Sequence, residues 1–147
     1  MTGSRPDVVI VGGGIAGLFT AKVLIETGHK VSVYEQAPAL GEVGAGVYLT
    51  PNSVRHLKRL GLLGEVEKWG ARVGKNSHYF RNDGSPIAPV QVMDLSGWNA
   101  TFGMHRADLI EFLAKSLPAG VVNTDHRGVG FEQTADKARV TFANGRT

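Results

Sequence analysis

Three glycines near the start of the chain have the spacing of a nucleotide-binding turn. Gly12, Gly14 and Gly17 give the pattern G-x-G-x-x-G between an apolar run and a segment of helical character. In such a unit the first glycine permits a tight turn, the second lets a pyrophosphate approach the backbone, and the third lets the helix pack close to the strand. The free amides and the dipole of the helix's first turn then attract the pyrophosphate.

An acidic residue, Glu35, closes the next apolar run at the distance that this motif requires. Its carboxylate would accept hydrogen bonds from an adenosine ribose. The alternatives are a glycine-rich turn that binds nothing and a surface carboxylate at a strand end. Because strand, helix and acid all fit, the pattern predicts an ADP-containing cofactor, without saying which one.

The elements that must hold these residues follow from hydrophobic periodicity. We predict a buried strand over residues 7–11, a helix over 15–27 that is apolar on most sides, and a second strand over 31–35. Together they form a βαβ unit of about 30 residues, which is the size that the motif needs. The sequence therefore indicates an α/β fold with a Rossmann-like unit and a parallel sheet.

Further elements are predicted along the rest of the chain. A glycine-rich loop over 41–47 suggests backbone that lies close to a ligand, although plain flexibility is the alternative. Residues 95–102 are predicted as loop. The predicted helices cover 51–62, 63–69 and 106–117, and the predicted strands cover 78–81, 87–92, 121–123, 128–133 and 138–142. The pair 78–81 and 87–92 forms a small antiparallel excursion, with Pro86 and Pro89 favouring an edge position.

Composition excludes several classes of function. Charged residues make up 20% of the chain and the net charge is only +3, with scattered basic residues, so nucleic-acid binding has little support. There is no cysteine, which excludes disulfides and thiolate metal sites, and the five histidines show no metal spacing. No stretch reaches the roughly 20 apolar residues of a membrane span. A cytoplasmic location is the default expectation, and oligomeric state is unconstrained.

The end of the sequence predicts further chain. Asn144-Gly145 follows the strand over 138–142 and is a strong hairpin-turn signal, yet only two residues remain for a return strand. A nucleotide-binding fold also needs more parallel strands than the three predicted here. We therefore expect that the sequence is truncated, the N-terminal part of a longer protein.

The order of motifs resembles one family of flavoenzymes. Gly44-Ala45-Gly46-Val47 precedes Pro51-Asn52, and Leu60-Gly61-Leu62 precedes His105-Arg106-Ala107-Asp108-Leu109. With the glycine motif and Glu35, this order resembles the class A FAD-dependent aromatic hydroxylases of the p-hydroxybenzoate hydroxylase fold. Within that group it is most similar to salicylate hydroxylase-like monooxygenases, over essentially the whole chain.

The resemblance implies a cofactor, FAD, and positions that hold it. Gly12, Gly14, Ile15 and Ala16, with Gly17 in the turn, would hold the pyrophosphate, and Glu35 with Gln36 the ribose. Gly46 and Val47 would run along the flavin, Arg106 would reach the pyrophosphate and ribityl chain, and Val129 would lie near the adenine. Residues 1–147 would be the N-terminal part of a FAD-binding domain, and 75–104 the first piece of its substrate-side layer.

The resemblance also implies a reaction. NADH or NADPH would reduce the flavin, and dioxygen would then form a C4a-hydroperoxide that hydroxylates an aromatic acid such as salicylate, a hydroxynicotinate or a hydroxybenzoate. Later family segments that complete the cofactor site and the substrate pocket would follow residue 147, so we expect no turnover from this chain alone. Its catalytic residues cannot be named, and no metal is expected.

Three other functions stay open. The chain could belong to another oxidoreductase of the same flavin fold, such as an oxidase, halogenase or reductase. It could be an NAD-binding dehydrogenase domain, although the loop over 41–47 weighs against this. It could also be a truncated, non-catalytic chain that is inert or binds only a nucleotide.

Overall fold

The computed structural model describes residues 6–41 and 45–147, which divide into two compact units. The first unit combines the chain up to residue 42 with residues 110–147, and the second comprises residues 43–109. Helix α4 (Arg106–Lys115) begins in the second unit and ends in the first.

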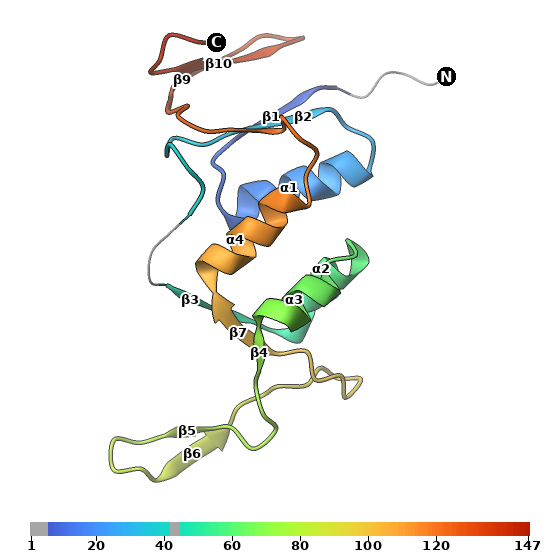
Figure 1. Cartoon of the computed structure of the whole chain (residues 1–147), viewed down its shortest axis with the longest axis vertical. Helices are drawn as coiled ribbons and strands as arrows, with labels where there is room; N and C mark the ends of the chain where they lie inside the picture. Colours follow the sequence, from blue (N-terminus) through green and yellow to red (C-terminus); the bar gives the residue numbers. More distant parts are fainter. Residues whose placement is uncertain (1–5, 42–44) are drawn as a thin grey trace. The chain divides into compact units, whose positions relative to one another are not determined.

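The first unit contains the predicted parallel sheet. Strands β1 (Val8–Val11), β2 (Val31–Tyr34) and β8 (Val122–Asn123) lie in the order β1-β2-β8. Both pairings are parallel, with Val8 opposite Val31 and Val33 opposite Val122. Figure 1 shows β1 and β2 side by side with α1 (Ile15–Glu26) connecting them. The predicted α/β fold with a Rossmann-like βαβ unit is therefore confirmed.

Burial explains why these segments take these forms. In β2 the side chains of Val31 and Val33 are buried while the residues between and after them are partly exposed, as the alternation of a strand requires. On α1, Leu18 and Ala21 are completely buried. A helix packed on a sheet must bury such a face, and the sequence supplies it.

A two-stranded antiparallel sheet completes the first unit. Strands β9 (Gly128–Gln133) and β10 (Ala138–Phe142) have the bounds that the sequence predicts. Phe142 is buried, and its ring lies 4.6 Å from the ring of Tyr34 and 5.3 Å from that of His126. The turn predicted at Asn144-Gly145 is also present, because the Gly145 amide donates to the Phe142 carbonyl.

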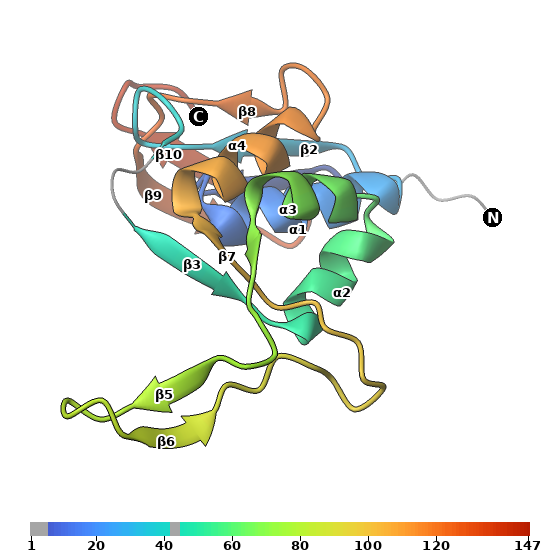
Figure 2. The ribbon, with the colours of Figure 1, turned by 60° about the horizontal axis from the view of Figure 1, so that its bottom comes forward.

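The second unit is built on an antiparallel sheet in the order β3-β7-β4. Its strands are β3 (Gly46–Leu49), β7 (Phe102–His105) and β4 (Ala71–Arg72). Helices α2 (Pro51–Arg59) and α3 (Leu63–Trp69) follow β3 in the chain, and their buried apolar side chains include Val54, Leu57 and Val66. In Figure 2, the hairpin of β5 (His78–Phe80) and β6 (Pro86–Pro89) extends away from this sheet.

The sheet of the second unit differs from the elements that the sequence predicts. Gly46 and Val47, predicted as part of a glycine-rich loop, are the first two residues of β3 and pair with His105 and Met104. Strands β4 and β7 were not predicted, and Phe102 was placed in a loop, because two to four residues around a glycine carry too little periodicity. The other part of that loop, residues 42–44, lies outside the described residues.

Several predicted elements are shorter in the structure. Helix α2 ends at Arg59 rather than residue 62, and α4 ends at Lys115 rather than 117. The returning strand of the excursion covers only Pro86–Pro89, between two prolines, rather than 87–92. Pro86 and Pro89 have no amide hydrogen to donate to a neighbouring strand. In the described residues β6 therefore pairs on one side, with β5.

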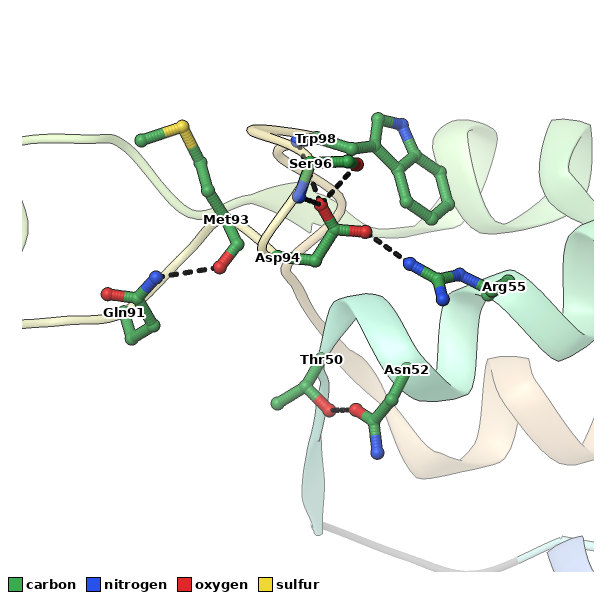
Figure 3. A network of polar contacts seen from close by, with 8 residues as sticks. All are labelled: Thr50, Asn52, Arg55, Gln91, Met93, Asp94, Ser96 and Trp98. Atoms are coloured by element: carbon green, nitrogen blue, oxygen red, sulfur yellow. Dashed lines mark hydrogen bonds and ion pairs between the residues drawn. The ribbon is translucent and has the colours of Figure 1, made fainter.

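A polar loop follows the hairpin in the second unit. Figure 3 shows the Asp94 carboxylate at its centre, where one oxygen accepts from the amides of Ser96 and Trp98, at 2.8 and 3.1 Å. The other oxygen pairs with the guanidinium of Arg55 on α2. This loop is therefore held both by its own backbone and by a helix of the same unit.

Candidate nucleotide-binding site

The turn between β1 and α1 depends on glycine at two positions. Gly12 has φ +110°, a backbone conformation that other residues rarely adopt, and its amide donates to the Tyr34 carbonyl at 2.7 Å. A Cβ on Gly17 would lie 1.9 Å from the Gly12 carbonyl oxygen. The third glycine of the motif therefore does what the sequence predicts, since it lets the helix begin directly against the turn.

The N-terminus of α1 has no side-chain cap, so its first amides are available to an anion. Gly14 precedes the helix in an extended conformation, without a side-chain cap, and the first turn carries no acidic residue. The first bond of the helix runs from the Leu18 amide to the Gly14 carbonyl, at 3.0 Å. The amides of residues 15–17 therefore have no acceptor within the helix, and with the helix dipole they fit a pyrophosphate.

Glu35 follows β2 and turns its carboxylate toward the glycine turn. Its Oε2 accepts from the Gly13 amide at 2.6 Å, and its Oε1 accepts from the Ala37 amide at 2.9 Å. The hydrogen bond from Ala37, helped by those from Gly13 and Gln36 and opposed by burial, holds the pKa of Glu35 below its usual value. The carboxylate is thus ionised at neutral pH, and its remaining lone pairs can accept from two ribose hydroxyls.

The predicted site residues divide between the two units. Gly12, Gly14, Ile15, Ala16, Gly17, Glu35, Gln36 and Val129 lie in the first unit, whereas Gly46, Val47 and Arg106 lie in the second. Gln36 is exposed next to Glu35. Val129 is on β9 and 59% exposed, and its neighbour Gly128 lies close to a methyl group of Val11 at the end of β1. Arg106 begins α4, and its amide donates to the Ala45 carbonyl.

One residue at this site, Gly13, was not predicted from the sequence. It occupies a position that the G-x-G-x-x-G pattern leaves unrestricted, yet its amide contacts the acid of the motif. The only signal in the sequence is that Gly12, Gly13 and Gly14 form a run of three glycines where the motif asks for two. Across the part of the chain that the structure describes, no group of three or more His, Asp or Glu side chains is placed to hold a metal ion.

The residues of the first unit therefore fit a dinucleotide. They provide a turn without side chains, open helix amides and an ionised carboxylate. Comparison with known protein families gives the same result, because a family model described as "FAD binding domain" matches residues 5–147. The chain belongs to this FAD-binding family.

Individual relatives of the chain are aromatic monooxygenases. It is 35% identical over 148 residues to a 3-amino-4-hydroxybenzoate 2-monooxygenase of Streptomyces platensis, covering 99% of this chain and 37% of that protein. It is 37% identical over 153 residues to a salicylate hydroxylase of Pseudomonas putida, covering 94% of this chain and 32% of that protein. The chain thus spans about a third of the length of the curated relatives it matches.

A solved structure supports the fold. A variant of HpxO from Klebsiella pneumoniae, crystallised with FAD, matches with a TM-score of 0.81 at 22% identity, covering 96% of this chain and 36% of that one. The expected family and fold, a FAD-binding fold with relatives among salicylate hydroxylases, are therefore confirmed. In the described residues, none of the helices is both long enough and apolar enough to cross a bilayer.

Proposed function

We propose that this chain is the N-terminal FAD-binding portion of a flavin-dependent monooxygenase that hydroxylates an aromatic acid. The observation that carries the proposal is the ionised carboxylate of Glu35 beside the open N-terminus of α1 in a member of a FAD-binding family. Salicylate, aminohydroxybenzoate and hydroxynicotinate monooxygenases among the relatives support an aromatic acid as substrate. The reductant would be NADH or NADPH, and the co-substrate dioxygen.

The roles of individual residues are part of this proposal. The amides of Ile15 and Ala16, next to Gly12 and Gly14, would bind the pyrophosphate, and the Glu35 carboxylate would accept from the ribose hydroxyls. Gln36 would lie beside the ribose and Val129 near the adenine. In the second unit, Gly46 and Val47 would run along the flavin, and the guanidinium of Arg106 would bind the cofactor near its pyrophosphate and ribityl chain.

The chemistry divides between cofactor and protein. Bound FAD supplies the redox chemistry and oxygen activation, and the protein supplies binding, orientation and a site from which water is excluded. The domain organisation also remains a proposal, namely that residues 75–104, including β5 and β6, begin the substrate-side layer of a larger protein. A cytoplasmic location likewise remains a proposal, as the default expectation.

Flavin retention tests the proposed cofactor. The purified chain is incubated with FAD, desalted and scanned for flavin absorbance, while isothermal titration compares FAD, ADP, FMN and NADH. The proposal predicts that FAD and ADP bind and that FMN does not, because the contacts of the first unit are all to the ADP half. Tight binding of NADH with no binding of FAD would instead support the dehydrogenase alternative. Retention of stoichiometric FAD after desalting would show that this chain holds the cofactor without further segments.

Substrate turnover tests the proposed reaction. A gene product that contains this sequence with its natural continuation is assayed for oxidation of NADH or NADPH, with and without salicylate, 6-hydroxynicotinate and 3-amino-4-hydroxybenzoate. The proposal predicts that one aromatic acid stimulates both reductant oxidation and formation of a hydroxylated product. Reductant oxidation that no aromatic acid stimulates would favour another oxidoreductase of the same fold.

A further inference from the structure

We infer that Gly13, the middle glycine of the turn, is a positioning residue that orients the Glu35 carboxylate toward the adenosine ribose. The inference rests on the proposed function, because it assumes that Glu35 receives a ribose. It goes beyond that function by giving a binding role to a position that the glycine motif leaves free.

The carboxylate is held from two sides. The Gly13 amide donates to Oε2 at 2.6 Å from the turn, and the Ala37 amide donates to Oε1 at 2.9 Å from the chain beyond β2. Two donors on different oxygens fix both the position and the plane of the group. Each carboxylate oxygen has about two acceptor positions, so one on each oxygen remains for a neighbouring pair of hydroxyls. A ribose with free 2′ and 3′ hydroxyls matches this arrangement.

Space at position 13 is as important as the amide. A Cβ on Gly13 would lie 2.9 Å from Cβ and 3.3 Å from Cγ of Glu35, and 2.9 Å from Cδ2 of Leu40. The end of the Leu40 side chain can rotate away. The Cβ of Glu35 follows directly from the backbone next to β2, where the Glu35 amide donates to the Asn123 carbonyl at 2.8 Å. A methyl group at position 13 would therefore displace the carboxylate from the Gly13 amide.

This requirement differs from that of the other glycines in the turn. Gly12 needs its positive φ, and Gly17 would clash with backbone. Gly13 has neither constraint, because its φ is not positive and the atoms it would meet all belong to side chains. Substitution by alanine at this position should therefore disturb the turn less than at Gly12 or Gly17, and its first effect should be on the Glu35 side chain.

The test measures how well the chain distinguishes ADP from 2′-deoxy-ADP, by isothermal titration. Loss of one hydrogen bond to a charged acceptor should weaken wild-type binding of 2′-deoxy-ADP about tenfold relative to ADP. In Gly13→Ala we expect the ADP affinity to fall toward that for 2′-deoxy-ADP, so that the ratio approaches one. The matched control is Gly64→Ala, because a Cβ at Gly64 on α3 meets nothing within 4 Å. This control should keep the wild-type ratio.

The outcomes separate the inference from the function on which it rests. A Gly13→Ala chain that keeps the tenfold ratio, whatever its overall affinity, overturns the role of Gly13 alone. A wild-type chain that binds neither FAD nor ADP overturns the proposed function and the ribose role together. Thermal unfolding of each variant shows whether it is folded under the conditions of the titration.

A second measurement on the wild-type chain does not depend on the variant's folding. The Gly13 and Ala37 amide protons are followed by NMR as the pH is lowered through the titration of Glu35. Both should shift with one common midpoint, below the usual glutamate value, because both donate to the same carboxylate. A Gly13 amide that does not follow the midpoint of Ala37 would overturn the inference.

Discussion

Arg55 on α2 and Asp94 in the loop after β6 form an ion pair between residues 39 positions apart in the sequence (Figure 3). The other Asp94 oxygen accepts from the Ser96 hydroxyl at 2.5 Å and from the Ser96 and Trp98 amides. Lys58, one turn along α2 from Arg55, lies 5.3 Å from the centre of the Trp98 ring. The loop is therefore fixed to the helix by two cation contacts, and the one made by Asp94 depends on the ionisation of its carboxylate.

The stability of the second unit should fall at low pH because of Asp94. The pKa of Asp94 is lowered to about 2, chiefly by the hydrogen bond from the Ser96 hydroxyl. The amides of Trp98 and Ser96 and the guanidinium of Arg55 lower it further, whereas desolvation opposes them. Because the pKa is lower in the folded state, this stabilisation is complete above the unfolded value of about 4 and is lost as the pH falls from there to about 2. Denaturant unfolding followed by tryptophan fluorescence at several pH values measures it.

The variant Asp94→Asn isolates this contribution. Since it cannot ionise, its unfolding free energy should depend less on pH between about 4 and about 2 than that of the wild type. Equal pH dependence in the two proteins would assign the acid sensitivity to other carboxylates.

Alanine at Gly17 should disrupt the turn between β1 and α1. Its Cβ would lie 1.9 Å from the Gly12 carbonyl oxygen, a backbone atom that cannot move without the strand. We expect the free energy of unfolding to fall by about 3 kcal/mol or more. Nucleotide binding should be lost as well. Gly64→Ala on α3 is the control, where alanine should gain between zero and about 1 kcal/mol. Similar unfolding curves for the two variants would contradict the close approach.

The buried hydroxyl of Thr101 should contribute to the second unit. Thr101 is 0% exposed, and its Oγ1 donates to the Val92 carbonyl at 2.8 Å. Thr101→Val keeps the shape but leaves this carbonyl without its donor, which should cost about 1–3 kcal/mol of unfolding free energy. Thr101→Ser keeps the hydroxyl and loses one methyl group, at about 1 kcal/mol. Chemical denaturation should therefore rank serine above valine, and the reverse order would show that the methyl group matters more.

Phe142 should stabilise the attachment of β10 to the parallel sheet. Its ring is 4% exposed and contacts Tyr34 of β2 and His126. Phe142→Ala should lower the unfolding free energy by about 3 kcal/mol or more, as for other buried phenylalanines. Phe131 on the paired strand β9 is 65% exposed, so Phe131→Ala should cost less than about 1 kcal/mol. Calorimetry on the two variants compares them directly, and equal losses would place Phe142 outside the core.

Much of the first unit could be predicted because its signals are local. The apolar run of β1, the glycines after it and the buried face of α1 are all adjacent in the sequence, and β9 and β10 have the predicted bounds. The sheet of the second unit could not be predicted in this way. Gly46 pairs with His105 across almost the whole unit, and neither strand is long enough to show a period by itself.

The sequence by itself determined the glycine turn, the helix that follows it and the acid after β2, because motif spacing and hydrophobic period act between near neighbours. Only the tertiary structure decided that the Gly13 amide donates to Glu35, that Arg55 pairs with Asp94, and that Gly46 and Val47 lie in a strand. Each of these contacts joins residues distant in sequence. Hydrophobic periodicity predicts which side of an element is buried. Which residue contacts that side depends on how the whole chain packs.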